Sequence, residues 1–122
     1  MNKVVIAAVI KNDKGQVLAV RLNKEKPEGV WVMPGGKLEE GESARNCVIR
    51  EAKEELGIEI KPIKIAGVGE VDYGEGNIWI FVYYQSELIS GTPTPQEENK
   101  TLEVKYIDPA DLHMSDKIIW IS

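Results

Sequence analysis

Several residue types are scarce in this chain, and each scarcity excludes a class of protein. The 122 residues include one cysteine, Cys47, so no intrachain disulfide can form, and we expect a reducing compartment, the cytoplasm. The single histidine, His113, is assigned to the surface or to a helix end rather than to catalysis. The apolar run at residues 4–10 follows a lysine and reads as a buried strand rather than a signal peptide. No stretch approaches the ~20 apolar residues needed to span a membrane, so no membrane partner is expected.

Positive charge is also scarce. The chain has 15 lysines and arginines against 20 aspartates and glutamates, a formal net charge of -5. A nucleic acid polymer requires a basic surface, so none is expected as a partner. Small phosphorylated substrates remain compatible, because a divalent cation can bridge carboxylates to phosphates. The length fits one domain with one core, residues 1–122.

Strand-like segments dominate the pattern. β-Branched and alternating residues predict strands at 4–10, 16–22, 31–33, 58–71, 78–84 and 101–107. The first two are expected to form a hairpin through a turn at 11–15, and the glycine pair Gly35-Gly36 is expected to form another turn. Pro62, Gly67 and Gly69 indicate a bulge in the fourth segment.

One strong helix lies inside this β-rich pattern. Ser43 is a suitable N-cap, the periodicity continues to about Leu56, and Gly57 is a natural C-terminal stop. A short second helix is expected after Asp108-Pro109. Together these segments predict an α+β fold with helices packed on a mixed sheet.

Three carboxylates, Glu51, Glu54 and Glu55, share one face of the predicted helix. Their mutual repulsion would destabilise an isolated helix, and a bound divalent cation would relieve it. Carboxylate oxygens suit Mg²⁺ or Mn²⁺. The same pattern also occurs on solvated helix surfaces, so the spacing to the residues upstream has to decide between the two interpretations.

That spacing resembles the Nudix box of the MutT/Nudix hydrolase family, G-x5-E-x7-R-E-U-x-E-E-x-G-U, with U a large aliphatic residue. Residues 36–58 read GKLEEGESARNCVIREAKEELGI. The matching positions are Gly36, Glu42, Arg50, Glu51, Glu54, Glu55, Gly57 and Ile58. Ala52 departs from the pattern at the first aliphatic position, which implies slightly looser packing. The preceding segment, WVMPGGK, resembles the W-x-x-P-G-G-K lead-in of the family.

The resemblance implies the Nudix fold, an α–β–α sandwich in which the box helix and a C-terminal helix pack on a mixed sheet. It also implies a role for each matching residue. Glu54 and Glu55 would be the main ligands of Mg²⁺ or Mn²⁺, with Glu51 as a further ligand or as the general base. The backbone carbonyl of Gly35 would add a ligand.

Two further roles follow from the same resemblance. Arg50 would pair with Glu42 and brace the loop against the helix. A carboxylate from a loop outside the box would complete the metal site. Of the adjacent pair Glu97 and Glu98 we choose Glu98.

The implied reaction is hydrolysis of the diphosphate linkage in a nucleoside diphosphate linked to a moiety X. The short chain and the loop GTPTPQEE favour a MutT-type (d)NTP pyrophosphohydrolase that releases NMP and pyrophosphate. Tyr73 keeps a diadenosine polyphosphate hydrolase as the alternative, with an ADP-ribose hydrolase third. A non-catalytic nucleotide sensor is the alternative of a different class. Such modules usually lose box carboxylates, and all are retained here.

Candidate substrate contacts lie outside the box, and the substrate is expected to be a small nucleotide. Phosphates could be contacted by Arg21, Lys24 and Lys37. The base could be contacted by Tyr73, Asn77, Trp79, Tyr83 and Asp116. Trp31 is assigned to packing. The sequence does not set the oligomeric state, and a homodimer stays open.

Overall fold

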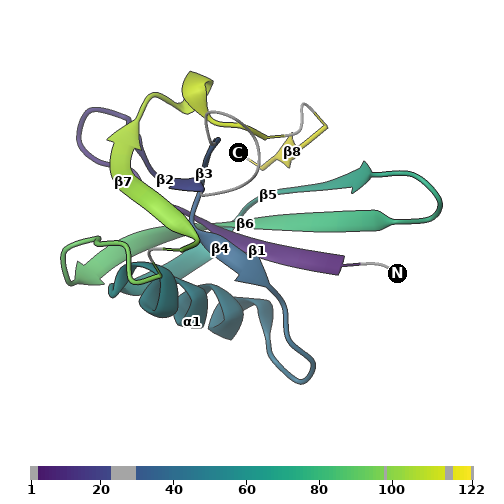
Figure 1. Cartoon of the computed structure of the whole chain (residues 1–122), viewed down its shortest axis with the longest axis horizontal. Helices are drawn as coiled ribbons and strands as arrows, with labels where there is room; N and C mark the ends of the chain where they lie inside the picture. Colours follow the sequence, from purple (N-terminus) through teal and green to yellow (C-terminus); the bar gives the residue numbers. More distant parts are fainter. Residues whose placement is uncertain (1–2, 23–29, 98, 115–116, 122) are drawn as a thin grey trace.

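In the part of the chain that the structure describes, two β-sheets and one α-helix form the fold. The computed structural model describes residues 3–22, 30–97, 99–114 and 117–121 (Figure 1). In Figure 1 the helix lies below the larger sheet, and the smaller sheet lies above it at the upper left. The described residues include no helix long and apolar enough to cross a membrane.

The larger sheet is mixed, as predicted. Its strand order is β4 (Gly35–Lys37), β1 (Lys3–Val9), β6 (Ile78–Ser90), β5 (Glu59–Asp72) and β8 (Ile119–Trp120). Strands β1 and β6 are parallel, and the other pairs are antiparallel. The smaller, antiparallel sheet has the order β3 (Trp31–Val32), β2 (Val17–Leu22) and β7 (Thr101–Ile107).

The predicted helix is confirmed as α1 (Ala44–Leu56). The Ser43 hydroxyl accepts a hydrogen bond from the Asn46 N–H at 3.1 Å, which satisfies one of the free amides of the first turn. Gly57 ends the helix with φ at 68°, in the left-handed region that favours glycine. The buried face of α1 consists of Cys47, Val48, Ala52 and Leu56. This packing leaves the carboxylates of α1 beside β4.

The predicted hairpin of the first two strands is wrong beyond its turn. The Leu18 N–H donates to the Ile10 carbonyl at 2.8 Å, but β1 and β2 then enter different sheets. Both edges of β1 are already paired, one with β4 and the other with β6. Strand β2 therefore pairs with β3 and β7 instead.

The turn predicted at Gly35-Gly36 is also wrong, because both glycines belong to β4 and neither has a positive φ. A Cβ atom on Gly35 would overlap the Ile6 carbonyl and the Ala7 Cα of β1. Glycine is therefore required by the close approach of two strands, not by a turn. The irregularity predicted in β5 is confirmed by its register shifts, and β6 continues to Ser90, beyond its predicted end.

The predicted C-terminal helix is only one 3₁₀ turn, η1 (Pro109–Asp111), capped by Asp108. The next residues leave the helix because the His113 N–H donates to the Trp31 carbonyl at 2.8 Å and joins the chain to β3. The described residues therefore hold one α-helical layer rather than the two of an α–β–α sandwich.

Replacing the N-cap provides a test of this helix assignment. Ser43→Ala leaves the Asn46 N–H without its partner, so we expect the free energy of unfolding to fall by about 1 kcal/mol. Ser43→Asp keeps an acceptor and should retain wild-type stability within a few tenths of a kcal/mol. Urea denaturation at neutral pH measures both. Equal stability of the alanine variant and the wild type would contradict the capping role.

Candidate active site

Three of the box carboxylates, Glu42, Glu51 and Glu54, converge on one guanidinium group, that of Arg50. Arg50 binds Glu42 through two hydrogen bonds, from Nε at 2.6 Å and from Nη2 at 3.0 Å, so the predicted pair is present. These bonds from Arg50 hold the pKa of Glu42 at about 2. Glu42 precedes the helix and Arg50 lies within it, so the pair ties the 38–43 loop to α1.

The same guanidinium orients two helix carboxylates. Arg50 Nη1 donates to Glu51 at 2.8 Å and to Glu54 at 3.1 Å. Glu39 lies 3.6 Å from Nη2 on the exposed side. The single positive charge of Arg50 is thus shared among four carboxylates, and the group keeps excess negative charge.

Glu51 fits against β4 because residue 36 has no side chain. A Cβ atom on Gly36 would overlap the carboxylate carbon and both carboxylate oxygens of Glu51. Burial in this position raises the pKa of Glu51, against the opposing effect of Arg50. The glycine at the start of the box therefore creates the space that the Glu51 carboxylate occupies.

Glu55 is a further carboxylate of the group whose pKa is raised. Its Oε1 accepts a hydrogen bond from the Gly35 N–H at 3.3 Å. Burial raises its pKa to about 7, the Gly35 bond opposes the shift, and the neighbouring charges of Glu51 and Glu97 add to it. A carboxylate held this way is a good ligand for a cation that replaces its lost solvation.

The loop between β6 and β7 brings Glu97 to the same cleft as Glu51 and Glu55. The loop is fixed to the last turn of α1 by hydrogen bonds from the Thr94 N–H to the Leu56 carbonyl, 3.1 Å, and from the Gln96 N–H to the Glu55 carbonyl, 2.9 Å. Glu97 pairs with Lys100 at 3.1 Å and lines a cleft together with Glu51 and Glu55. The predicted ligand Glu98 lies outside the described residues.

The cleft has a volume of about 1160 Å³, and its floor is one face of the larger sheet. Trp79, Phe81 and Tyr83 alternate along β6 and present their rings in a row, with centroids 6.4 and 6.5 Å apart and interplanar angles of 25° and 15°. Met33 and Met114 also line the cleft. An acidic edge thus adjoins a flat aromatic floor, an arrangement suited to a ligand with a charged part and a planar part.

Comparisons with known proteins identify this arrangement. The family model for the NUDIX domain matches residues 1–121. The chain belongs to the NUDIX family. A MutT NUDIX hydrolase from Burkholderia pseudomallei has the same fold, with a TM-score of 0.81 and 28% sequence identity over 94% of this chain and 89% of that chain.

Two curated relatives carry names that refer to oxidised guanine nucleotides. The 8-oxo-dGDP phosphatase NUDT18 of Danio rerio is 32% identical over 85% of this chain but 31% of its own length, so the chain spans about a third of that relative. The putative 8-oxo-dGTP diphosphatase 2 of Mycobacterium tuberculosis is 27% identical over 95% of this chain and 80% of its own length.

The donor chemistry of this NUDIX site fits a hard divalent cation, since partly buried carboxylates, Glu51 and Glu55, face the cleft together with Glu97. The described side chains nevertheless form no ready group of three ligands. The reason is that Glu51 and Glu54 are both turned toward Arg50. A bound cation would share or replace those contacts.

The structure places only some of the predicted substrate contacts in the cleft. Lys37 and Tyr73 line the cleft. Asn77 is not among the described lining residues, but its Oδ1 accepts a hydrogen bond from Trp79 Nε1 at 3.2 Å, so it supports the aromatic floor. Arg21 pairs with Glu103 at 3.4 Å and is not among the described lining residues. Two candidates lie outside the described residues, Lys24 and Asp116.

Some lining residues were not found from the sequence. Phe81 lies between Trp79 and Tyr83, and the alternation of the three along one strand was the available signal. His113 is exposed, as predicted, yet it also lines the cleft, because its N–H bond to Trp31 holds the 112–114 segment against β3. The sequence contains no local signal for that contact.

The raised pKa of Glu55 predicts a pH dependence of stability in the cation-free protein. The pKa of Glu55 is about 7 in the folded protein and near 4.5 in the unfolded chain, so protonation of Glu55 stabilises the fold. This stabilisation is fully present below about pH 4.5 and is lost as the pH rises through 7. Relative to Glu55→Gln, we expect the wild type to lose up to about 3 kcal/mol over that range. Glutamine can still accept the Gly35 N–H bond. Chemical denaturation across pH 4.5–8 tests this, and parallel curves for the two proteins would contradict it.

Proposed function

We propose that this NUDIX domain hydrolyses a phosphoric anhydride bond in a small nucleotide, a nucleoside diphosphate linked to X, with Mg²⁺ or Mn²⁺ as cofactor. The observation that carries the proposal is the set of Glu51, Glu55 and Glu97 along one edge of a large cleft with an aromatic floor. A nucleotide has the matching parts, since its phosphates can be bridged to carboxylates by a cation and its base is planar.

In this mechanism Glu54 and Glu55 would hold the cation, and the Gly35 carbonyl would add an oxygen ligand. When bound, the cation polarises the phosphoryl oxygens and lowers the pKa of an attacking water. Glu51 either adds a ligand or accepts the proton of that water. Arg50 is a positioning residue that holds Glu51 and Glu54 in orientation through its hydrogen bonds.

The preferred substrate is a nucleoside triphosphate of the (d)NTP class, hydrolysed in the MutT manner to NMP and pyrophosphate. The support is the similarity to a MutT NUDIX hydrolase and to a relative named as an 8-oxo-dGTP diphosphatase. Tyr73, 59% exposed at the cleft, keeps a diadenosine polyphosphate as the second candidate, ahead of ADP-ribose. The cytoplasm is the proposed compartment, because the single cysteine, Cys47, forms no disulfide, which suits a reducing environment.

A nucleotide panel tests the reaction. With Mg²⁺ or Mn²⁺ the protein should release pyrophosphate or NMP from a nucleoside triphosphate, a dinucleoside polyphosphate or ADP-ribose. Glu54→Gln should reduce kcat by about 10²-fold or more, because a charged ligand is lost. Glu59→Gln removes an exposed carboxylate from the start of β5 and is the matched control. Tight nucleotide binding without cation-dependent turnover would instead support a sensor.

The two glycines of β4 provide a second test. Gly36→Ala directs a methyl group at the Glu51 carboxylate, so we expect about tenfold or greater loss of kcat with the fold retained. Gly35→Ala directs the methyl group at the β1 backbone and should lower the melting temperature instead. Kinetics and thermal unfolding of both variants separate these effects. Wild-type kcat in Gly36→Ala would show that the position of Glu51 does not limit the reaction.

A further inference from the structure

Strand β7 forms an open edge of the smaller sheet. Within the described residues its only neighbouring strand is β2, and Figure 1 shows β7 on the outer side of that sheet. The Leu18 N–H donates to the Ile10 carbonyl, away from β7, so Leu18 and the opposite residue, Tyr106, form a non-hydrogen-bonded pair. The N–H and carbonyl groups of Tyr106 and of Val104, two residues earlier, therefore point away from β2, toward the open edge.

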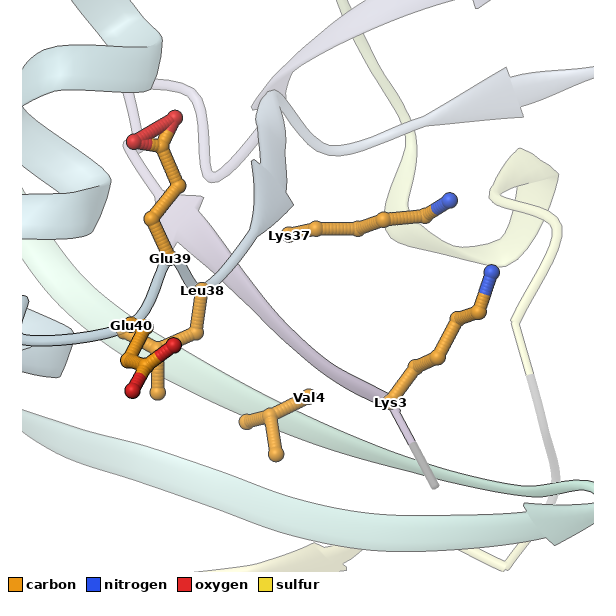
Figure 2. Close-up of a pocket in the computed structure, with 6 residues that line it drawn as sticks. All are labelled: Lys3, Val4, Lys37, Leu38, Glu39 and Glu40. Atoms are coloured by element: carbon orange, nitrogen blue, oxygen red, sulfur yellow. The ribbon is translucent and has the colours of Figure 1, made fainter. Parts of the chain in front are cut away.

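The other outer strands are poorer templates for strand addition. Strands β3 and β8 have two residues each. Strand β4 has three, and Figure 2 shows the charged side chains of Lys37, Glu39 and Glu40 spreading in different directions at its end. The outer side of β5 is interrupted by β8, by Pro62 and by three register shifts. Short strands, charges, proline and bulges all hinder pairing at an edge, so β7 is the longest uninterrupted edge of the described residues.

The sequence of β7 is complementary to itself in one antiparallel register. Val104 lies between Glu103 and Lys105, whose side chains are both exposed. When two copies pair about a two-fold axis at Val104, each Glu103 lies opposite Lys105 of the other copy. Opposite charges directly across a strand pair stabilise it, whereas like charges destabilise it.

The contacts within one chain leave this register possible. Glu103 lies 3.4 Å from Arg21 of β2, and the Nζ of Lys105 lies 4.8 Å from the Trp31 ring centroid of β3. Residues opposite one another and residues two apart along a strand share a face, so these side chains all lie on one face of the smaller sheet. The backbone edge of β7 lies beside them and stays open.

We propose that β7 is the interface of a homodimer, in which two copies pair antiparallel about Val104 and join their smaller sheets into one. In this register the two Val104 residues exchange N–H to carbonyl hydrogen bonds. Leu102, which is 46% exposed at the start of β7, comes next to Tyr106 of the other copy and loses solvent exposure. The proposal does not depend on the proposed reaction, because none of these residues is among the described residues that line the cleft.

Sedimentation velocity over a concentration series measures the association. We expect the mass to rise from the 13.6 kDa of one chain toward twice that value. Lys105→Glu and Glu103→Lys each place like charges opposite one another, so the dissociation constant should rise about tenfold in either variant. Lys14→Glu makes the same charge change in the exposed turn after β1 and should leave the dissociation constant unchanged.

The two charge variants should complement each other only in this register. An equimolar mixture of Lys105→Glu and Glu103→Lys should form heterodimers, because both opposed positions then carry opposite charges. The double variant should regain the wild-type dissociation constant for the same reason. Amide hydrogen exchange of the wild type gives a second readout. Exchange at Val104 and Tyr106 should slow as the protein concentration rises, whereas Lys105, whose N–H faces β2, should exchange slowly throughout.

Three results would overturn the interface. These are a protein that stays monomeric up to about 1 mM, a dimer whose dissociation constant neither charge variant changes, and a mixture of the two variants that associates no better than either alone. The exchange measurement uses the wild type, so it decides the proposal even if the loss of the Arg21 contact unfolds Glu103→Lys. Nucleotide hydrolysis enters none of these readouts, so the failure of either proposal leaves the other standing.

Discussion

The site depends on the contact between Glu51 and the backbone of β4 at Gly36. Any side chain at position 36 would occupy the volume of the Glu51 carboxylate. The apolar face of α1 packs in the core, and the space at Gly36 lets the Glu51 carboxylate lie against β4 and line the cleft. Arg50 supports the contact from the other side, since its bonds to Glu42, Glu51 and Glu54 limit the orientations of all three carboxylates. Geometry and charge at the site are therefore set together.

Electrostatic strain follows from this arrangement. Arg50 satisfies Glu42, whose pKa falls, but Glu51 and Glu55 lie in more buried positions where burial raises their pKa. The protein thus keeps carboxylates where water solvates them poorly, which costs stability in the cation-free state and favours cation binding. Such strain is typical of functional sites, because an ordinary helix surface would leave these groups solvated.

The sequence predicted the fold best where local patterns decide the structure. The capped helix and the mixed sheet follow from residues close together in the chain, so they were recoverable. The hairpin of β1 with β2 was not, because β4 and β6 compete for the edges of β1 over long sequence separations. The prediction of a C-terminal helix failed for a similar reason, since the hydrogen bond from the His113 N–H to the Trp31 carbonyl ends the helix after one turn.

The sequence by itself identified the family through the spacing of its box, and the resemblance to that family implied the pairing of Arg50 with Glu42. Only the tertiary structure decided that Gly35 and Gly36 pair with β1 as a strand and that Glu97 lies beside Glu55. These relations join segments far apart in the chain, and strand register and packing set such distances, whereas residue spacing carries no information about them.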